Sequence, residues 1–154
     1  MRFKILLFSF LFLLGTLINL KDAPNDDKAK AKAVITKTNN AIGIAHMTVK
    51  RTKKYTGKLG KALKHERFAT KQYKAGNYDK SIYHAFYARK LADEVMKENN
   101  AKINMLFLFA PDEKALQSSS PSDDDLIKEA NTDDPTEIKD ESLMGNGTMG
   151  LEIL

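Results

Sequence analysis

Three histidines, His46, His65 and His84, are the side chains of this sequence best suited to bind a metal or to transfer a proton. They follow one another at intervals of nineteen residues without any His-x-x-x-His pair, and Glu66 is the only carboxylate beside one of them. A zinc site needs about four converging ligands, and the chain has no cysteine to supply one. We therefore expect no bound metal and no cofactor, and we expect solvated or half-buried histidines.

Nucleophilic catalysis has little support in the sequence. The serines gather near the C-terminus, and no Gly-x-Ser-x-Gly motif is present. The segment from Gly57 to Lys61 contains two glycines and two lysines, but it lacks the spacing of a phosphate-binding loop and the hydroxyl residue that follows its lysine. The acidic run Asp123–Asp125 lacks the alternating ligands and the glycine of a calcium loop. These observations predict a protein that is not an enzyme.

A dense run of positive charge between residues 50 and 74 is the strongest chemical feature of the chain. Tyr55 and Tyr73 are interleaved with it, and Glu66 is its only carboxylate. Such a surface attracts phosphates and anionic lipid headgroups. An ordinary solvated helix face would also have this composition. The candidate polyanion-binding residues are Lys50, Arg51, Lys53, Lys54, Lys58, Lys61, Lys64, Lys71 and Lys74.

The charge of the chain is divided between two regions of opposite sign. Residues 21–100 carry 19 Lys and Arg against 8 Asp and Glu, whereas residues 101–154 carry 4 against 12. This asymmetry is typical of a basic folded body that is followed by an acidic tail. We expect the tail to act within its own molecule, where it screens the basic body at short range.

The N-terminus has the pattern of a targeting segment. Arg2 and Lys4 precede an apolar run from Ile5 to Leu14 that only Ser9 interrupts, as in a signal peptide. From residue 5 to residue 20 a helix would span about 24 Å, a little less than the hydrocarbon core of a bilayer. We expect a secreted or periplasmic protein whose residues 1–20 are cleaved off, or a membrane-anchored one that keeps residues 5–20. Export argues against a nucleic-acid partner.

Helical periodicity runs through the middle of the chain. Residues 21–32 are expected to be an exposed linker, and apolar spacing predicts helices near residues 34–49, 59–75 and 79–98. Residues 111–154 are rich in Ser, Asp, Pro and Gly, so they bury too little apolar surface to offset the entropy of ordering them. The predicted organisation is a basic helical domain over residues 33–110 and an acidic, largely disordered tail over residues 111–154.

Small side chains mark one face of the helix over residues 79–98. They recur at spacings of four, three and four residues, and small residues let a second helix approach closely. The two later helices should therefore form an antiparallel hairpin, and the apolar run Ile103–Phe109 should pack back over it because it is too short to span a bilayer. The residues expected to pack the hairpin are Phe68, Ala69, Gly76, Tyr78, Ser81, Ile82, Ala85, Ala88 and Ala92.

The stretch from Tyr73 to Ile82, Tyr-Lys-Ala-Gly-Asn-Tyr-Asp-Lys-Ser-Ile, resembles the turn between the two helices of a tetratricopeptide repeat. Phe68 and Ala69 match the large and small packing positions of the first helix of that repeat, and Ala88 matches the alanine late in the second. The resemblance covers about residues 62–95. It implies a helical hairpin that binds a protein or a peptide.

Three positions depart from the repeat. His65 stands where the family prefers a large aromatic residue, Gln72 where it prefers tyrosine, and Ala85 where it prefers phenylalanine. No second copy follows, although such repeats normally stack on neighbours. The chain is thus similar to a single tetratricopeptide-like unit rather than to an array.

Taken together, the sequence predicts an all-α fold, either a small antiparallel hairpin or a three-helix bundle with a further helix within residues 28–56. The expected function is an exported, non-enzymatic protein-interaction or envelope-associated helical module whose partner is an unknown protein or peptide. The alternative is a binder of surface polyanions or anionic membranes that uses the Lys50–Lys74 face.

Overall fold

The computed structural model describes residues 24–145, 149–152 and 154. Over these residues the chain is all-helical, and none of the helices combines the length and the apolar character needed to cross a bilayer. The targeting segment expected at residues 1–20 lies outside the described residues. The α-helices are α1 (Pro24–Thr52), α2 (Lys58–Lys74), α3 (Tyr78–Glu98), α4 (Pro111–Gln117) and α5 (Asp123–Asp133), and two 3-10 helices are η1 (Met105–Phe107) and η2 (Asp140–Met144).

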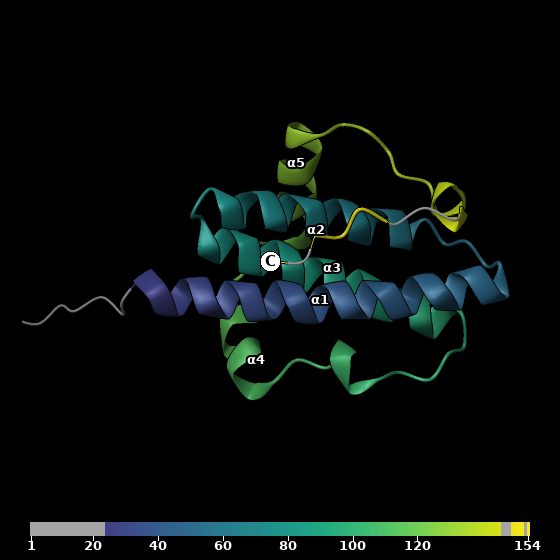
Figure 1. The fold of residues 1–154 in the computed structure, drawn as a ribbon, viewed down its shortest axis with the longest axis horizontal. Coiled ribbons are helices and arrows are strands. Elements are labelled where there is room, and N and C mark those ends of the chain that lie inside the picture. Colours follow the sequence, from purple (N-terminus) through teal and green to yellow (C-terminus); the bar gives the residue numbers. More distant parts are fainter. Residues whose placement is uncertain (1–23, 146–148, 153) are drawn as a thin grey trace, which may run out of the picture.

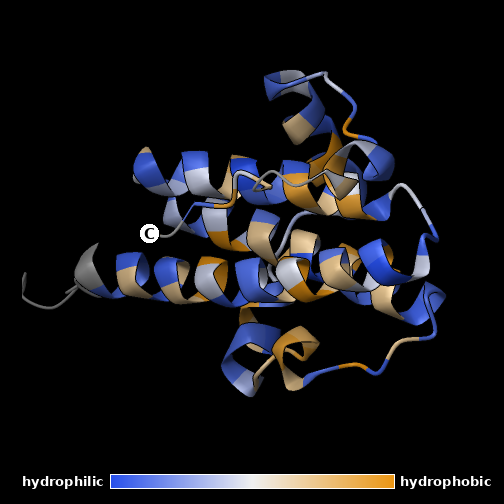
Figure 2. Cartoon of the chain, turned by 45° about the vertical axis from the view of Figure 1, so that its right-hand side comes forward, coloured by the Kyte–Doolittle hydropathy of each residue, from blue (hydrophilic) through white to orange (hydrophobic). Residues whose placement is uncertain are grey.

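The three long helices form the centre of the molecule. α2 and α3 run side by side in opposite directions, and α1 lies along both, with more of its contact on α3 (Figure 1). α4 and η1 lie on one side of this layer and α5 on the other (Figure 1). Figure 2 shows that apolar and polar residues alternate along α1–α3, and the buried apolar residues of these helices pack together in two clusters. The buried core is accordingly shared by all three long helices.

α1 is longer than the sequence pattern predicts, because residues 24–32 continue the helix instead of forming a linker. Asp26 and Asp27 lie in its first turn, where negative charge interacts favourably with the helix dipole. Asp26 also pairs with Lys30 one turn later, at 2.8 Å. Ala31 is fully buried, so the apolar stripe of this helix begins before Val34.

The small-residue face of α3 is fully covered. Ser81, Ala85, Ala88 and Ala92 have no exposed surface, and the Thr38 hydroxyl of α1 donates a hydrogen bond to the Ala85 carbonyl at 3.1 Å. A side chain of one helix can reach the backbone of another only when the two axes lie close together, which small residues permit. α1 therefore packs against this face of α3. The sequence pattern did not predict this contact.

The turn between α2 and α3 closes as a Schellman motif. Gly76 has a φ of 82°, a left-handed conformation that glycine adopts without strain. The amide of Gly76 donates to the Tyr73 carbonyl at 3.0 Å, and the amide of Asn77 donates to the Gln72 carbonyl at 2.9 Å. These are the two bonds that define the motif.

The disorder expected over residues 111–154 is not confirmed. α4, α5 and η2 all lie within that range, and Leu126, Ala130, Glu113 and Asp140 are buried. The small number of apolar residues that led to the expectation is offset by carboxylates that bind the basic body. This type of anchoring does not depend on hydrophobic periodicity.

The apolar run Ile103–Phe109 packs back only in part. Phe107 is buried, and the Phe109 ring meets the Phe86 ring edge-on with centroids 5.3 Å apart. Met105 and Leu108 are largely exposed. The run therefore covers the body with its phenylalanines and exposes Ile103, Met105 and Leu108.

Candidate functional site: the junction between the basic body and the acidic tail

The nine candidate polyanion-binding residues do not remain free on one open face. Five of them contact carboxylates or carbonyl oxygens of other residues; these five are Lys54, Lys58, Lys64, Lys71 and Lys74. Their partners are Glu94, Glu98, Asn131, Asp133, Thr136 and Glu152. Most of these partners belong to the C-terminal acidic region. Among the described residues, Lys50, Arg51, Lys53 and Lys61 take part in no ion pair. The basic surface is thus partly covered by the tail of its own chain.

Three carboxylates of the acidic region reach into the body, and we refer to them as the anchoring carboxylates. They are Glu113 of α4, Glu129 of α5 and Asp140 of η2. Glu113 contacts α1 and α3, Glu129 contacts α3, and Asp140 contacts the beginning of α2. The helices α4, α5 and η2 thus each have an attachment point of their own.

Asp140 binds the N-terminal end of α2. Its carboxylate accepts hydrogen bonds from the backbone amides of Thr56 at 2.9 Å, of Gly57 at 2.8 Å and of Gly60 at 2.8 Å. The first amides of a helix have no partner within the helix, and the dipole favours a negative charge there. Because Asp140 is only 1% exposed, this is a buried, charge-assisted cap that comes from a distant part of the chain.

Glu113 compensates the charge of Arg89. Arg89 has no exposed surface, and its Nη2 donates to the Glu113 carboxylate at 2.8 Å. Lys37 pairs with the same carboxylate at 2.8 Å, and the Ala110 amide donates to it at 2.8 Å. Burial alone would raise the pKa of Glu113, but these three hydrogen bonds outweigh it and lower that pKa.

His65 and His84 form a buried pair, contrary to the expectation of solvated or half-buried histidines. They are 3% and 0% exposed, and their Nδ1 atoms lie 3.0 Å apart. The His84 Nε2 lies 3.0 Å from the Glu129 carboxylate, which also pairs with Lys80. The Tyr87 ring covers His65 edge-on. The pair therefore links α2 and α3 to α5 through one line of polar contacts.

The hydrogen bonds define the protonation of the pair. Burial lowers the pKa of both histidines, to about 3 for His65, whereas the bond to Glu129 raises the pKa of His84 without cancelling the effect. A neutral His84 that donates from Nε2 to Glu129 must accept at Nδ1. His65 therefore donates its Nδ1 hydrogen to His84, and a second proton between the rings would disrupt this contact.

This arrangement predicts a loss of stability in acid. Below pH 6.5 the unfolded chain protonates His65, whereas the folded chain does so only near the lowered pKa of about 3. The stabilising contribution is therefore complete above pH 6.5 and decreases as the pH falls. At pH near 5 we expect the free energy of unfolding to be about 2 kcal/mol lower than at neutral pH from this histidine alone.

Urea unfolding at the two pH values measures the effect, with a His65→Phe chain as the control. That variant should lose about 2 kcal/mol less between neutral pH and pH near 5. Glu66, whose pKa burial raises, has the opposite pH dependence, but both proteins contain it. Equal losses in the two proteins would contradict the assigned role of His65.

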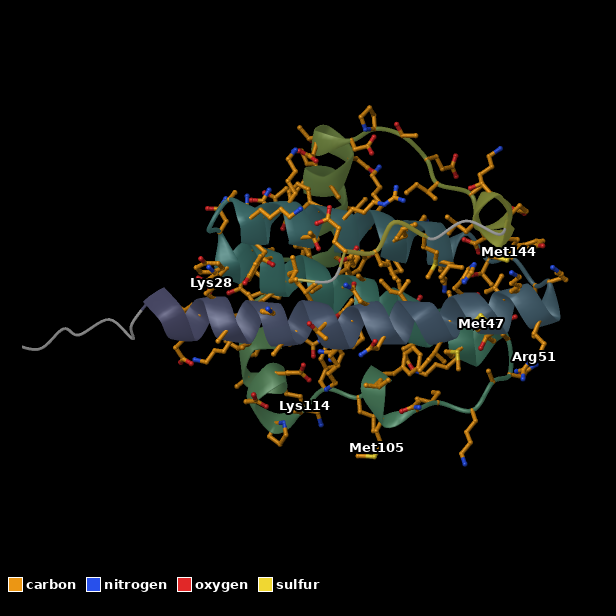
Figure 3. The ribbon with its side chains drawn as sticks, viewed as in Figure 1. Lys28, Met47, Arg51, Met105, Lys114 and Met144 are labelled. Atoms are coloured by element: carbon orange, nitrogen blue, oxygen red, sulfur yellow. The ribbon has the colours of Figure 1, made fainter. Side chains whose placement is uncertain are left out.

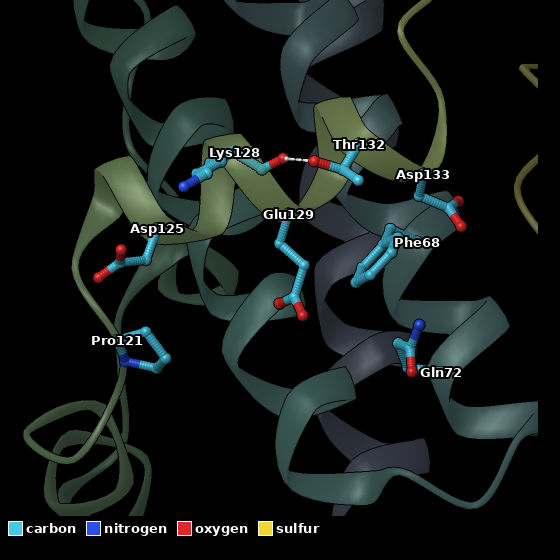
Figure 4. A pocket seen from close by; sticks show the side chains of 8 residues that line it. All are labelled: Phe68, Gln72, Pro121, Asp125, Lys128, Glu129, Thr132 and Asp133. Atoms are coloured by element: carbon cyan, nitrogen blue, oxygen red, sulfur yellow. Dashed lines mark hydrogen bonds between the residues drawn. The ribbon is translucent and has the colours of Figure 1, made fainter.

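A groove of about 600 Å³ opens between α2 and α5 (Figure 4). Phe68 and Gln72 contribute from α2, and Pro121, Asp125, Lys128, Glu129, Thr132 and Asp133 line the groove from α5 and the segment before it. In Figure 4 the Phe68 ring and the Glu129 carboxylate point into the space below α5. Lys80 and Lys71 pair with Glu129 and Asp133. The groove thus combines an aromatic base with a polar rim on which two of the carboxylates are paired with lysines.

The hairpin-packing residues lie along the interior of α2 and α3. Phe68, Ala69, Ser81, Ile82, Ala85, Ala88 and Ala92 are buried, Gly76 forms the turn, and Tyr78 is half-buried with its ring 5.7 Å from that of Tyr73. The contacts of Arg89, Glu113, Glu129 and Asp140 could not be predicted from the sequence. Single acidic residues in a Ser- and Asp-rich region carry no periodic signal that distinguishes them from solvated ones.

In the described part of the chain, no group of three or more His, Asp or Glu side chains that could hold a metal ion is found. The His46 Nε2 lies 2.8 Å from the Leu143 carbonyl oxygen. Comparisons with protein-family models, with curated proteins and with solved structures gave no match for this chain.

Proposed function

We propose that the chain is an exported, non-enzymatic helical module that binds another polypeptide in the groove between α2 and α5. In this proposal α1, α2 and α3 act as a three-helix bundle, and α2 with α3 forms its single tetratricopeptide-like unit. The observation that carries the proposal is the groove itself. Its volume of about 600 Å³ is within the usual range of ligand sites, about 300–1,000 Å³.

The lining of the groove suits a peptide better than a small charged ligand. Phe68 at its base offers an apolar contact, and the hydroxyl, amide and carboxylate groups of Thr132, Gln72 and Asp125 surround it. Grooves between helices bind amphipathic segments through such a combination of apolar anchors and polar edges. The anchoring carboxylate Glu129 fixes α5, so one wall of the groove depends on the His84 contact.

The proposed location of the protein is outside the cytosol. The apolar segment over residues 5–14, with its preceding positive charges, supports export. A cleaved segment would release a secreted or periplasmic module, and a retained one would hold the module at the membrane through residues 5–20. In both cases the groove would lie outside the cytosol, where its partner would be another exported or envelope-associated polypeptide.

Site-specific photocrosslinking tests the groove. A photoreactive residue at Thr132, on the groove wall, should crosslink a discrete polypeptide in the cells that make this protein. Thr36 provides a matched control, because both threonines are exposed helix residues whose hydroxyls bond the carbonyl four residues earlier. The same label at Thr36 should give no such product, and a Gln72→Trp change should remove the Thr132 product. Equal crosslinking at the two positions would contradict the proposal.

A polyanion-binding surface is the second candidate function. The observation that favours it is that Arg51, Lys53 and Lys61 are exposed and form no ion pair among the described residues. If these residues bind a polyanion, replacing all three by serine should make the chain elute from heparin at a clearly lower salt concentration, because each lost phosphate- or sulfate-type contact reduces the salt-dependent affinity. Unchanged retention would remove this candidate.

A further inference from the structure

The 3-10 turn η1 and its neighbours expose an unusual amount of apolar surface. Met105 is 82% exposed, Leu108 58% and Ile103 37%. Figure 2 shows η1 as a hydrophobic element at the edge of the molecule, and Figure 3 shows Met105 projecting from it away from α1. Scattered exposed apolar residues are common, but several within one short segment mark an interaction site.

The turn is held firmly by the residues around it. The Asn104 side chain accepts a hydrogen bond from the Leu106 amide at 3.1 Å, and Phe107 is buried beneath the turn. Lys37 of α1 donates to the Leu108 carbonyl at 2.9 Å. The apolar side chains are therefore presented outward by a fixed backbone, and their exposure is not a consequence of a frayed loop.

Positive charge surrounds the turn. Lys102 precedes it and Lys114 follows on α4; both are exposed and form no ion pair among the described residues. The buried Arg89 and the partly buried Lys37 contribute two positive charges against the one negative charge of Glu113, to which both are bound. Asp112 is the other carboxylate in this segment. The segment and its immediate partners thus carry more positive than negative charge.

We infer that the η1 turn inserts into the interface of an anionic lipid bilayer. A convex turn with aliphatic side chains fits a deformable surface, and lysines beside such side chains are attracted to anionic headgroups. This inference goes beyond the proposed function, because it concerns another edge of the molecule and another class of partner. It also differs from the Lys50–Lys74 face, since it requires apolar side chains as well as charge.

A single tryptophan reports the insertion directly, because the chain contains none of its own. In the full chain, the Met105→Trp variant should show blue-shifted emission and quenching by brominated lipid with vesicles that contain phosphatidylglycerol. Met47 is the matched control, since it is another exposed methionine, 64% exposed, that lies on α1 (Figure 3). The Met47→Trp variant should show neither change, even if the N-terminal segment holds the chain on the vesicle.

The contribution of the neighbouring residues is measured in the Met105→Trp background. Leu108→Ser should weaken vesicle partitioning about tenfold, which is the effect of removing one well-buried aliphatic side chain from an interface. Vesicles of phosphatidylcholine alone should bind more weakly than those with phosphatidylglycerol. Absent quenching, equal quenching of the Met47→Trp and Met105→Trp chains, or partitioning unaffected by Leu108→Ser would each overturn the inference. None of these outcomes affects the groove proposal, which the Thr132 crosslink tests separately.

Discussion

Replacing Glu113 by alanine is expected to lower the free energy of unfolding by about 3–5 kcal/mol, because it leaves the buried Arg89 guanidinium without its compensating charge. Arg89 is fully buried, and Glu113 is its only hydrogen-bond partner among the described residues. The Phe109 ring, 4.4 Å from the guanidinium carbon, offers a favourable but weaker cation–π contact. The total free energy of unfolding of a domain of this size is about 5–15 kcal/mol, so the loss would be a large part of its stability.

Arg89→Met provides the matched control for that prediction. It removes the buried charge and keeps a flexible side chain of similar length, and Glu113 then retains Lys37 and the Ala110 amide. The large cost of breaking a buried ion pair comes from the charge left without a partner, and the Glu113 carboxylate still has two partners in this variant. Urea unfolding should therefore show a large loss for Glu113→Ala and a much smaller one for Arg89→Met. Similar losses would show that the pair itself, and not an uncompensated charge, determines stability.

The long helices could be predicted from the sequence because their signals are periodic and local. The helices expected over residues 59–75 and 79–98 correspond to α2 and α3, and Gly76 marks their junction because only a left-handed residue completes the Schellman turn. α1 was predicted too short, because the Ala and Lys residues before Val34 provide helix propensity without a clear apolar stripe. Helix ends depend on such weak preferences.

The attachment of the acidic region could not be predicted in the same way. Composition indicated that residues 111–154 bury little apolar surface, and it correctly suggested attraction to the basic body, as the pairs of Lys71 with Asp133 and of Lys90 with Asp123 illustrate. It could not indicate which carboxylate is buried. Asp140 and Asp134 are chemically identical in the sequence, yet only Asp140 meets the free amides of a helix end.

The contacts that form the candidate site could not be predicted from the sequence either. Phe68 was expected inside the hairpin and is buried there, but its second role at the base of the groove depends on α5, which comes from the region expected to be disordered. His65 and His84 lie nineteen residues apart in the sequence. Their contact follows from the register of α2 on α3, which periodicity does not specify. Geometry across helices, rather than residue type, therefore creates the site.

Gly60→Ala is expected to detach η2 from α2. A Cβ at residue 60 would lie 1.8 Å from the Ile138 carbonyl oxygen and 2.7 Å from its carbon, and both belong to the backbone, so the segment before Asp140 must move. That movement breaks the bonds from Thr56, Gly57 and Gly60 to Asp140. Because hydrogen bonds to a charged group contribute about 1.5–3 kcal/mol each and are not additive, we expect a loss of about 3 kcal/mol.

A Gly→Ala substitution in α1 should instead raise the free energy of unfolding. Gly43 lies within α1, and a Cβ there would meet no atom within 4 Å, so Gly43→Ala should stabilise the chain by up to about 1 kcal/mol through helix propensity. Adding Asp140→Asn to each variant then identifies the mechanism. Asp140→Asn should lower the free energy of unfolding strongly in the Gly43→Ala chain and hardly at all in the Gly60→Ala chain. The effects of two substitutions on stability do not add when the residues interact. Additive losses in the Gly60→Ala chain would mean that Asp140 keeps its place on α2, and that the steric contact alone causes the damage.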